Sequence, residues 1–174
     1  MNWTEFLLKE IEIEFAATIK LLDKVDEAKL DWKPQSGSNW MTVRQLLHHI
    51  TDACGAGCKA FATENWALPD GRKYEDLPPQ ELFPPAEILP AVQSIEEAKR
   101  LLSADFALAR QMVEEAGESD LCNRMIAAPW APSARFPLGW QVHQMVLHLD
   151  KHKSQLFYYL KLQGVPVDTA DLWG

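Results

Sequence analysis

Apolar side chains recur at steps of three and four residues along four separate stretches of this chain, with polar and charged side chains between them. This spacing is typical of amphipathic helices that bury one face and expose the other. It predicts helices over residues 3–25, 42–65, 94–116 and 138–163. Four such helices indicate an all-α fold, and a four-helix bundle is the simplest way to bury their apolar faces.

The segments between the second, third and fourth helices are rich in proline. Residues 66–90 exclude a long helix, because they contain Pro69, Pro78, Pro79, Pro84, Pro85 and Pro90. We therefore expect a long connection between helices 2 and 3 that covers one end of the bundle, and it allows these two helices to run parallel. Residues 118–137 predict an ordered loop that contains aromatic side chains.

Composition and charge narrow the classes of function. The length of 174 residues predicts a single domain over 1–174. The formal net charge is −8, and Lys and Arg form no cluster, so we expect no nucleic-acid partner. No apolar run approaches the ~20 residues of a membrane span, and the acidic start differs from a signal peptide. Three cysteines form no disulfide framework. These features favour a cytoplasmic protein without a membrane partner.

Two histidines on the last predicted helix are placed for metal binding. His148 and His152 are four residues apart, so both imidazoles lie on one face of the helix and can bind a single ion. A third ligand must come from elsewhere, and His49 is the candidate. On a helical wheel His49 lies within about 60° of Leu46 and about 40° of Ala53, at the edge of the apolar face.

The other histidines and the paired cysteines point away from this group. His48 lies about 100° from His49, and His143 about 140° from His148, so we expect both to be exposed. Cys54 and Cys58 are also four residues apart. They lie about 140–180° from His49 on the wheel and are expected to be small buried thiols.

The pattern resembles the DinB/YfiT-like superfamily of bacterial four-helix bundle proteins. The family shows a histidine late in a leucine-rich turn of the second helix, which is His49 in MTVRQLLHHITDA. On the last helix it shows His-x-x-x-His followed three residues later by Gln, which is His148, His152 and Gln155 here. A WKP sequence after the first helix and a Gly-x-Pro after the last also match. Many members carry a further histidine where this chain has Lys151.

The resemblance implies an up-down-down-up bundle with a divalent metal, usually zinc or nickel, held by His49, His148 and His152. It also implies a metal-dependent enzyme that acts on a small-molecule substrate, because some members resemble thiol transferases. These use a low-molecular-weight thiol, bacillithiol, or mycothiol in the related maleylpyruvate isomerases. Dimers are common in the family, so a homodimer is expected.

Other interpretations of the same residues remain open. Three imidazoles leave a coordination position free, which is typical of a catalytic rather than a structural zinc site. A metal there would activate either a thiol, for thiol transfer, or water, for hydrolysis. The competing interpretation is a non-catalytic metal-binding or small-molecule-binding dimer, or a polar cluster bridged by water. A di-iron site is set aside, because neither metal-site helix contains Glu-x-x-His.

Several neighbouring residues have less definite predictions. Gln155 is a candidate to hydrogen-bond a ligand or the substrate. Asp52 and Asp150 receive no catalytic role, and no general base is identified. Tryptophans near helix starts and loops are candidates to line the mouth of a pocket: Trp40, Trp130 and Trp140.

Overall fold

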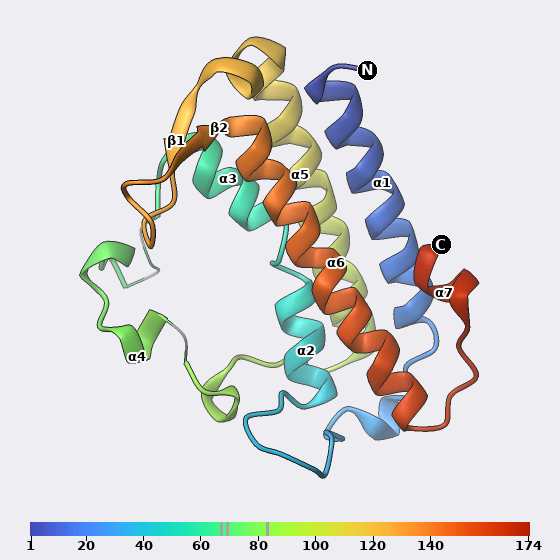
Figure 1. The fold of residues 1–174 in the computed structure, drawn as a ribbon. Coiled ribbons are helices and arrows are strands. Elements are labelled where there is room, and N and C mark those ends of the chain that lie inside the picture. Colours follow the sequence, from blue (N-terminus) through green and yellow to red (C-terminus); the bar gives the residue numbers. More distant parts are fainter. Residues whose placement is uncertain (67, 69, 83) are drawn as a thin grey trace.

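The computed structural model describes residues 1–66, 68, 70–82 and 84–174. Three long helices dominate it, namely α1 (Trp3–Leu22), α5 (Ile95–Asn123) and α6 (Leu138–Leu162). Two shorter helices, α2 (Val43–Ile50) and α3 (Gly55–Thr63), follow one another beside them (Figure 1). α1 packs on α5 and α6, α3 packs on the same two helices, and α2 packs on α6. The mostly helical fold is confirmed, while the up-down-down-up order stays a prediction.

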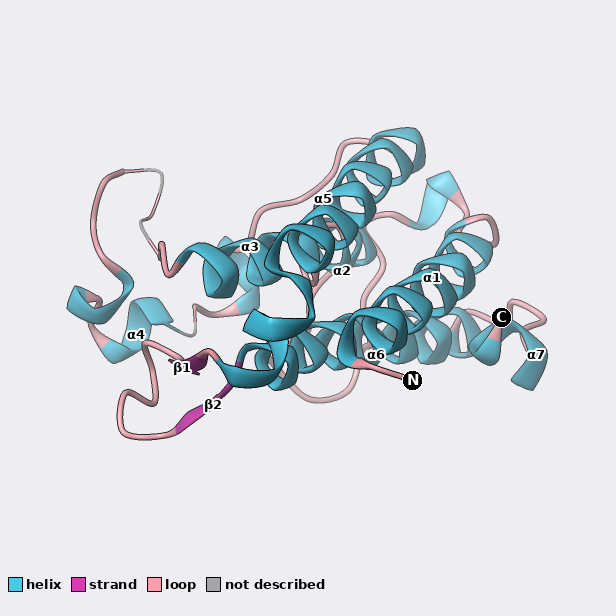
Figure 2. Ribbon diagram, turned by 90° about the horizontal axis from the view of Figure 1, so that it is seen from above, coloured by secondary structure: helices cyan, strands magenta, loops and turns pink. Residues whose placement is uncertain are grey.

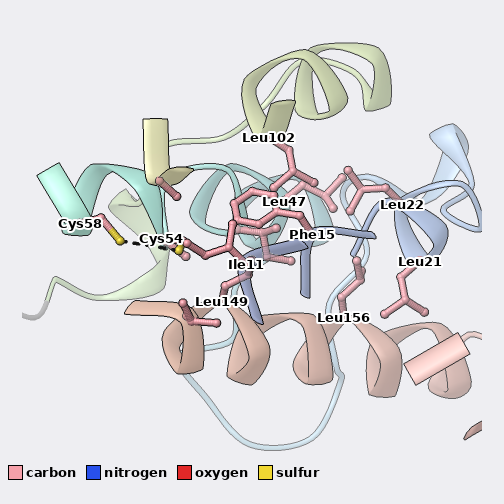
Figure 3. Packing of buried hydrophobic residues seen from close by; sticks show 14 of the residues in the cluster. Ile11, Phe15, Leu21, Leu22, Leu47, Cys54, Cys58, Leu102, Leu149 and Leu156 are labelled. Atoms are coloured by element: carbon pink, nitrogen blue, oxygen red, sulfur yellow. Dashed lines mark hydrogen bonds between the residues drawn. The ribbon is translucent and has the colours of Figure 1, made fainter. Parts of the chain in front are cut away.

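The interior is a continuous apolar core. Leu7, Ile11 and Leu21 of α1 are fully buried, as are Leu149 and Leu156 of α6. Figure 3 shows apolar side chains of α1, α2, α5 and α6 meeting between the helices. Removing this much apolar surface from water supplies the main driving force for folding.

The connections hold more structure than expected. Residues 66–90 contain α4 (Pro79–Leu82) and 3-10 turns at Tyr74–Asp76 and Ala86–Ile88. Residues 118–137, predicted to be a loop, contain the end of α5 and an antiparallel hairpin. Its strands are β1 (Met125–Ala127) and β2 (Arg135–Pro137), the only strands among the described residues (Figure 2). The segment after α6 contains α7 (Thr169–Trp173), which packs on α1.

The sequence predicts that the third helix ends at residue 116, just before Gly117, but the helix continues past this glycine. Gly117 has a positive φ of 65°, which favours glycine, but helical structure resumes beyond it and continues to Asn123. The carboxylate of Glu118 then accepts hydrogen bonds from the backbone nitrogens of Trp3 and Thr4, at 3.1 and 2.9 Å. This contact joins the kinked end of α5 to the first turn of α1.

The predicted helix over residues 42–65 is wrong in one respect, because it is broken at residues 51–54. It begins as expected, with a capping box between Thr42 and Gln45. After the break, the carboxylate of Asp105 on α5 accepts hydrogen bonds from the backbone nitrogens of Cys54, Gly55 and Ala56, at 3.3, 2.8 and 2.9 Å. A buried carboxylate from another helix thus starts α3 anew.

Gly55 permits this close approach. A Cβ atom at this position would collide with the backbone oxygen of Asp105 and lie 2.7 Å from its side-chain Oδ1. Glycine therefore lets α3 begin directly on α5. The break changes the direction of the backbone between His49 and α3.

None of the described helices is both long and apolar enough to cross a membrane.

We expect Asp105→Ala to lower the free energy of unfolding by about 2–4 kcal/mol, because it leaves buried amides of α3 without their acceptor. Chemical denaturation followed by circular dichroism measures this change. Ser103→Ala, at an exposed position on the same helix, is the control and should cost less than about 0.5 kcal/mol. A loss for Asp105→Ala as small as that of the control would show that the cap contributes little.

Candidate metal centre

The structure brings together the three histidines predicted from the sequence. The Nε2 atom of His49 on α2 lies 3.2 Å from Nε2 of His148 and 3.0 Å from Nε2 of His152, both on α6. The remaining side of the triangle, between His148 and His152, is 3.1 Å. Among the described residues, these three form the one group of His, Cys, Asp or Glu side chains arranged to hold a metal ion.

A backbone carbonyl orients His148. Its Nδ1 atom lies 3.1 Å from the oxygen of Ala53, which can only accept, so Nδ1 carries the proton. Ala53 lies in the break between α2 and α3, where its carbonyl faces a side chain instead of continuing a helical ladder. The break therefore has a local consequence, because it supplies the acceptor that turns His148.

A relay of hydrogen bonds orients His152 in the same sense. The Tyr159 hydroxyl donates to the carbonyl of Met41 at 3.1 Å, so its oxygen is free to accept from Gln155 Nε2 at 3.2 Å. The amide oxygen of Gln155 then faces Nδ1 of His152 at 3.0 Å, and that nitrogen must donate. The predicted role of Gln155 as a hydrogen-bonding partner is consistent with this contact, whereas no sequence pattern pointed to Tyr159.

These contacts fix the protons of two rings. In neutral His148 and His152 the proton resides on Nδ1, so each Nε2 presents a lone pair toward the other. His49 Nε2 can contribute a single proton, which cannot bridge all three sides of the triangle. A cation held between the three nitrogens would resolve this conflict.

The spacing of the nitrogens fits a divalent ion. Nitrogens bound to one ion at about 2.0–2.1 Å lie about 3.3–3.4 Å apart in tetrahedral geometry and about 2.9 Å apart in octahedral geometry. The observed distances of 3.0–3.2 Å fall between these limits. Either geometry leaves at least one coordination position beyond the three histidines.

Burial keeps the rings neutral. Burial, together with the nearby His152 and His148 rings, lowers the pKa of His49 to about 4. Burial also lowers the pKa of His148 and His152, with a contribution from the positive charge of Lys151. Metal ligation needs unprotonated imidazoles, so the three histidines are in the competent state at neutral pH.

The two aspartates near the site differ in position. Asp52 Oδ1 lies 4.0 Å from Nδ1 of His49, too far for a direct hydrogen bond. Burial and the Asp105 carboxylate raise the pKa of Asp52, although its side chain is 52% exposed. Asp150 points elsewhere and pairs at 3.1 Å with Lys153, a buried lysine that also contacts Glu14 of α1 at 2.7 Å.

The remaining histidines and cysteines lie outside the cluster. His48 is partly buried, and so is His143, whose ring packs on Phe6 at 5.2 Å between centroids. The prediction that both are exposed is wrong. For His143 the reason is that α1 covers this side of α6. Cys54 and Cys58 are buried with sulfurs 3.9 Å apart, as predicted. The Cys58 thiol and burial raise the pKa of Cys54, so it stays protonated.

A pocket of about 560 Å³ opens beside the cluster, with His148 in its wall. Trp130 and Trp140 line it, in agreement with their predicted position, whereas Trp40 packs on Tyr159 at 6.3 Å between ring centroids. The connection over residues 66–90 contributes Trp66 and Tyr74 to the wall. The connection over residues 66–90 therefore forms part of the wall of the pocket next to the histidines.

Comparison with known proteins gives one positive result. The sequence profile described as the DinB superfamily matches residues 10–156, most of the chain and all three histidines. No curated protein matches the chain.

We expect Gln155→Leu to weaken zinc binding about 10–100-fold, because it removes the acceptor that holds the Nδ1 proton of His152. Gln155→Glu keeps an oxygen in that place and should retain most of the affinity. Competition with a chromophoric chelator measures both. Gln144→Leu, on the same helix, is the matched control. Equal losses in the Leu and Glu variants would mean that the hydrogen bond does not orient His152.

The metal-free protein should lose stability in acid through His49. The pKa of His49 is lowered to about 4 in the folded state. As the pH falls below about 6.5, His49 is therefore protonated in the unfolded chain but stays neutral in the folded protein until about pH 4. Between pH 7 and 4.5 this contribution falls by about 1–2 kcal/mol, allowing for solvent screening of a partly exposed ring.

Urea denaturation at several pH values compares the chelator-treated wild type with His49→Gln. The variant should lose less stability on acidification, whereas His48→Gln should follow the wild type. A wild type and His49→Gln variant with parallel pH profiles would contradict the assignment of a lowered pKa to His49.

Proposed function

We propose that this chain, which belongs to the DinB superfamily, binds a divalent metal through His49, His148 and His152 and is a metal-dependent enzyme. Zinc or nickel is the proposed metal. The proposed reaction is transfer of a low-molecular-weight thiol to an electrophilic small molecule, or hydrolysis of that molecule.

The observation that carries this proposal is the convergence of three Nε2 atoms within 3.0–3.2 Å of one another. Nε2 of His148 and Nε2 of His152 carry no proton, because the Nδ1 protons of these rings are donated to the oxygens of Ala53 and Gln155. Neutral imidazoles with outward-fixed protons are what divalent zinc and nickel require of histidine ligands.

The site also has features of a catalytic rather than a closed centre. His49, His148 and His152 would hold the metal as three neutral ligands, and it would supply Lewis acidity that favours loss of a proton from water or a thiol at neutral pH. Among the described residues, no Asp, Glu, Cys or His side chain joins the three histidines as a fourth ligand. In this proposal the substrate occupies the adjoining pocket, whose wall includes His148.

Thiol transfer balances as an exchange at one electrophilic carbon. The sulfur–hydrogen bond breaks, a sulfur–carbon bond forms, and the leaving group departs with its electron pair and is protonated. In hydrolysis, water takes the place of the thiol. Asp52, 4.0 Å from His49 and in the pocket wall, is the nearest carboxylate for accepting the proton that is released.

The remaining expectations complete the proposal. We propose an up-down-down-up bundle that works as a cytoplasmic homodimer, with a small-molecule substrate as its partner. The second candidate is a non-catalytic dimer that binds a metal or small molecule. The partial exposure of the histidines and the adjoining pocket favour the enzyme.

The first experiment measures metal in protein purified without a histidine tag, by inductively coupled plasma mass spectrometry. We expect near-stoichiometric zinc or nickel in the wild type and its loss in His49→Ala, His148→Ala and His152→Ala. The control variants His48→Ala and His143→Ala should retain it. A wild type that binds no divalent metal after supplementation at neutral pH would overturn the proposal.

The second arm of this experiment separates enzyme from binding protein. The metal-loaded protein is incubated with a thiol and an electrophile, and loss of free thiol is followed. Turnover that needs both metal and thiol supports transfer, and consumption of the electrophile without thiol supports hydrolysis. Full metal content without turnover over a broad panel of electrophiles would favour the non-catalytic candidate.

A further inference from the structure

The pocket beside the histidines has an apolar interior and a charged end. Its volume of about 560 Å³ lies in the range that holds small-molecule ligands. Most of the wall consists of small side chains, aromatic rings and Met145, together with the uncharged amides of Gln141 and Gln144. Its charged and histidine side chains are Asp52, His148 and Lys151. A ligand in this pocket would therefore meet two different environments.

The aromatic part of the wall is assembled from separate connections. Trp66 and Tyr74 come from the segment after α3, and Trp130 comes from the turn between β1 and β2. The ring centroid of Trp130 lies 5.3 Å from that of Trp66 and 5.6 Å from that of Tyr74. Phe61 of α3 packs on Trp66 at 4.7 Å. These four rings form one cluster, which we call the aromatic wall.

A second aromatic pair lies on the hairpin side. Phe136 of β2 stacks on Trp140 of α6 with centroids 4.1 Å apart. Phe136 and Trp130 are 38% and 48% exposed, although both are large apolar side chains next to a cavity. Exposed aromatic surface that lines a concave site favours a flat apolar ligand.

The charged end lies on α6. Lys151 is three residues after His148, so both lie on neighbouring parts of the helix surface, and both line the pocket. Lys151 is exposed, and among the described residues no carboxylate forms an ion pair with it. Its ammonium group is therefore available to an anion that enters the pocket.

We propose that the ligand of this pocket is a flat, largely apolar molecule, such as an aromatic compound, that carries an anionic group next to its reactive end. The aromatic wall holds the body, and Lys151 binds the anionic group beside His148. This inference names the substrate class of the site and thus rests on the proposed function for the reaction. Binding to the pocket itself does not require the metal.

The geometry disfavours a cationic ligand. Recognition of a cation by aromatic side chains uses free ring faces directed at one void. In the aromatic wall the rings meet edge to face, with interplanar angles of 85° between Phe61 and Trp66 and 83° between Trp66 and Trp130. Each ring edge covers part of a neighbouring face. The positive charge of Lys151 opposes a cation, whereas Asp52 in the same wall acts in the opposite sense.

The test compares three bicyclic probes that differ in charge: 2-naphthoate, neutral 2-naphthylmethanol and cationic 2-naphthylmethylammonium. Isothermal titration calorimetry on the metal-free protein measures their affinities. We expect 2-naphthoate to bind most tightly. Lys151→Gln should weaken 2-naphthoate about three- to tenfold and change 2-naphthylmethanol less than about twofold.

Two further variants separate the apolar and charged contributions. Trp130→Ala should weaken the anionic and neutral probes alike, about tenfold, because it opens the aromatic wall. Lys161→Gln, an exposed lysine farther along α6, is the matched control and should leave all affinities unchanged. Circular dichroism verifies that each variant is folded.

Three results would overturn the inference: no saturable binding of any probe at millimolar concentration, preference for the cationic probe, or equal loss of the anionic and neutral probes in Lys151→Gln. Because the protein is metal-free here, these results are independent of the metal content. Failure of the metal proposal would appear in the metal content, whereas failure of the pocket proposal would appear in the affinities of the probes.

Discussion

Three imidazole nitrogens that lie 3.0–3.2 Å apart repel one another unless positive charge lies between them. The packing of α2 against α6 imposes this arrangement. α2 contributes His49 from its own length, and the segments at its two ends contribute the carbonyls of Met41 and Ala53. One short helix with its flanks therefore supplies one ring and directs the other two. The long helices α1, α5 and α6 provide the rigid frame against which this is possible.

The sequence predicted the parts of the site that depend on helical periodicity. His148 and His152 fall on one face of α6 because a helix repeats every 3.6 residues, and His49 faces them because it borders the apolar side of its own helix. The break at residues 51–54 could not be predicted in this way. The break depends on Asp105, about fifty positions away in the chain. The helix propensities of residues 51–54 do not reveal such a distant partner. The two glycines at Gly55 and Gly57 were the one local signal.

Backbone acceptors are the second kind of feature that the sequence concealed. The orientation of His148 depends on the carbonyl of Ala53, and the relay through Tyr159 ends on that of Met41. Neither residue has a side chain that suggests a role, since any residue carries the same carbonyl. His143 was misjudged for a related reason, because the helical wheel shows one helix and Phe6 belongs to another. Helices thus carry the three histidines, whereas the adjoining pocket is lined both by helices α3 and α6 and by the connections, which tolerate change more readily.

Concentrating these supports in α2 has a kinetic consequence. Because α2 is eight residues long, it is held by its capping box and its contacts rather than by intrinsic helix stability. A brief local opening of this segment withdraws His49 and frees the rings of His148 and His152 in a single event. The exchange rate of an ion held by the three histidines would then be governed by the opening frequency of α2, while the long helices stay folded.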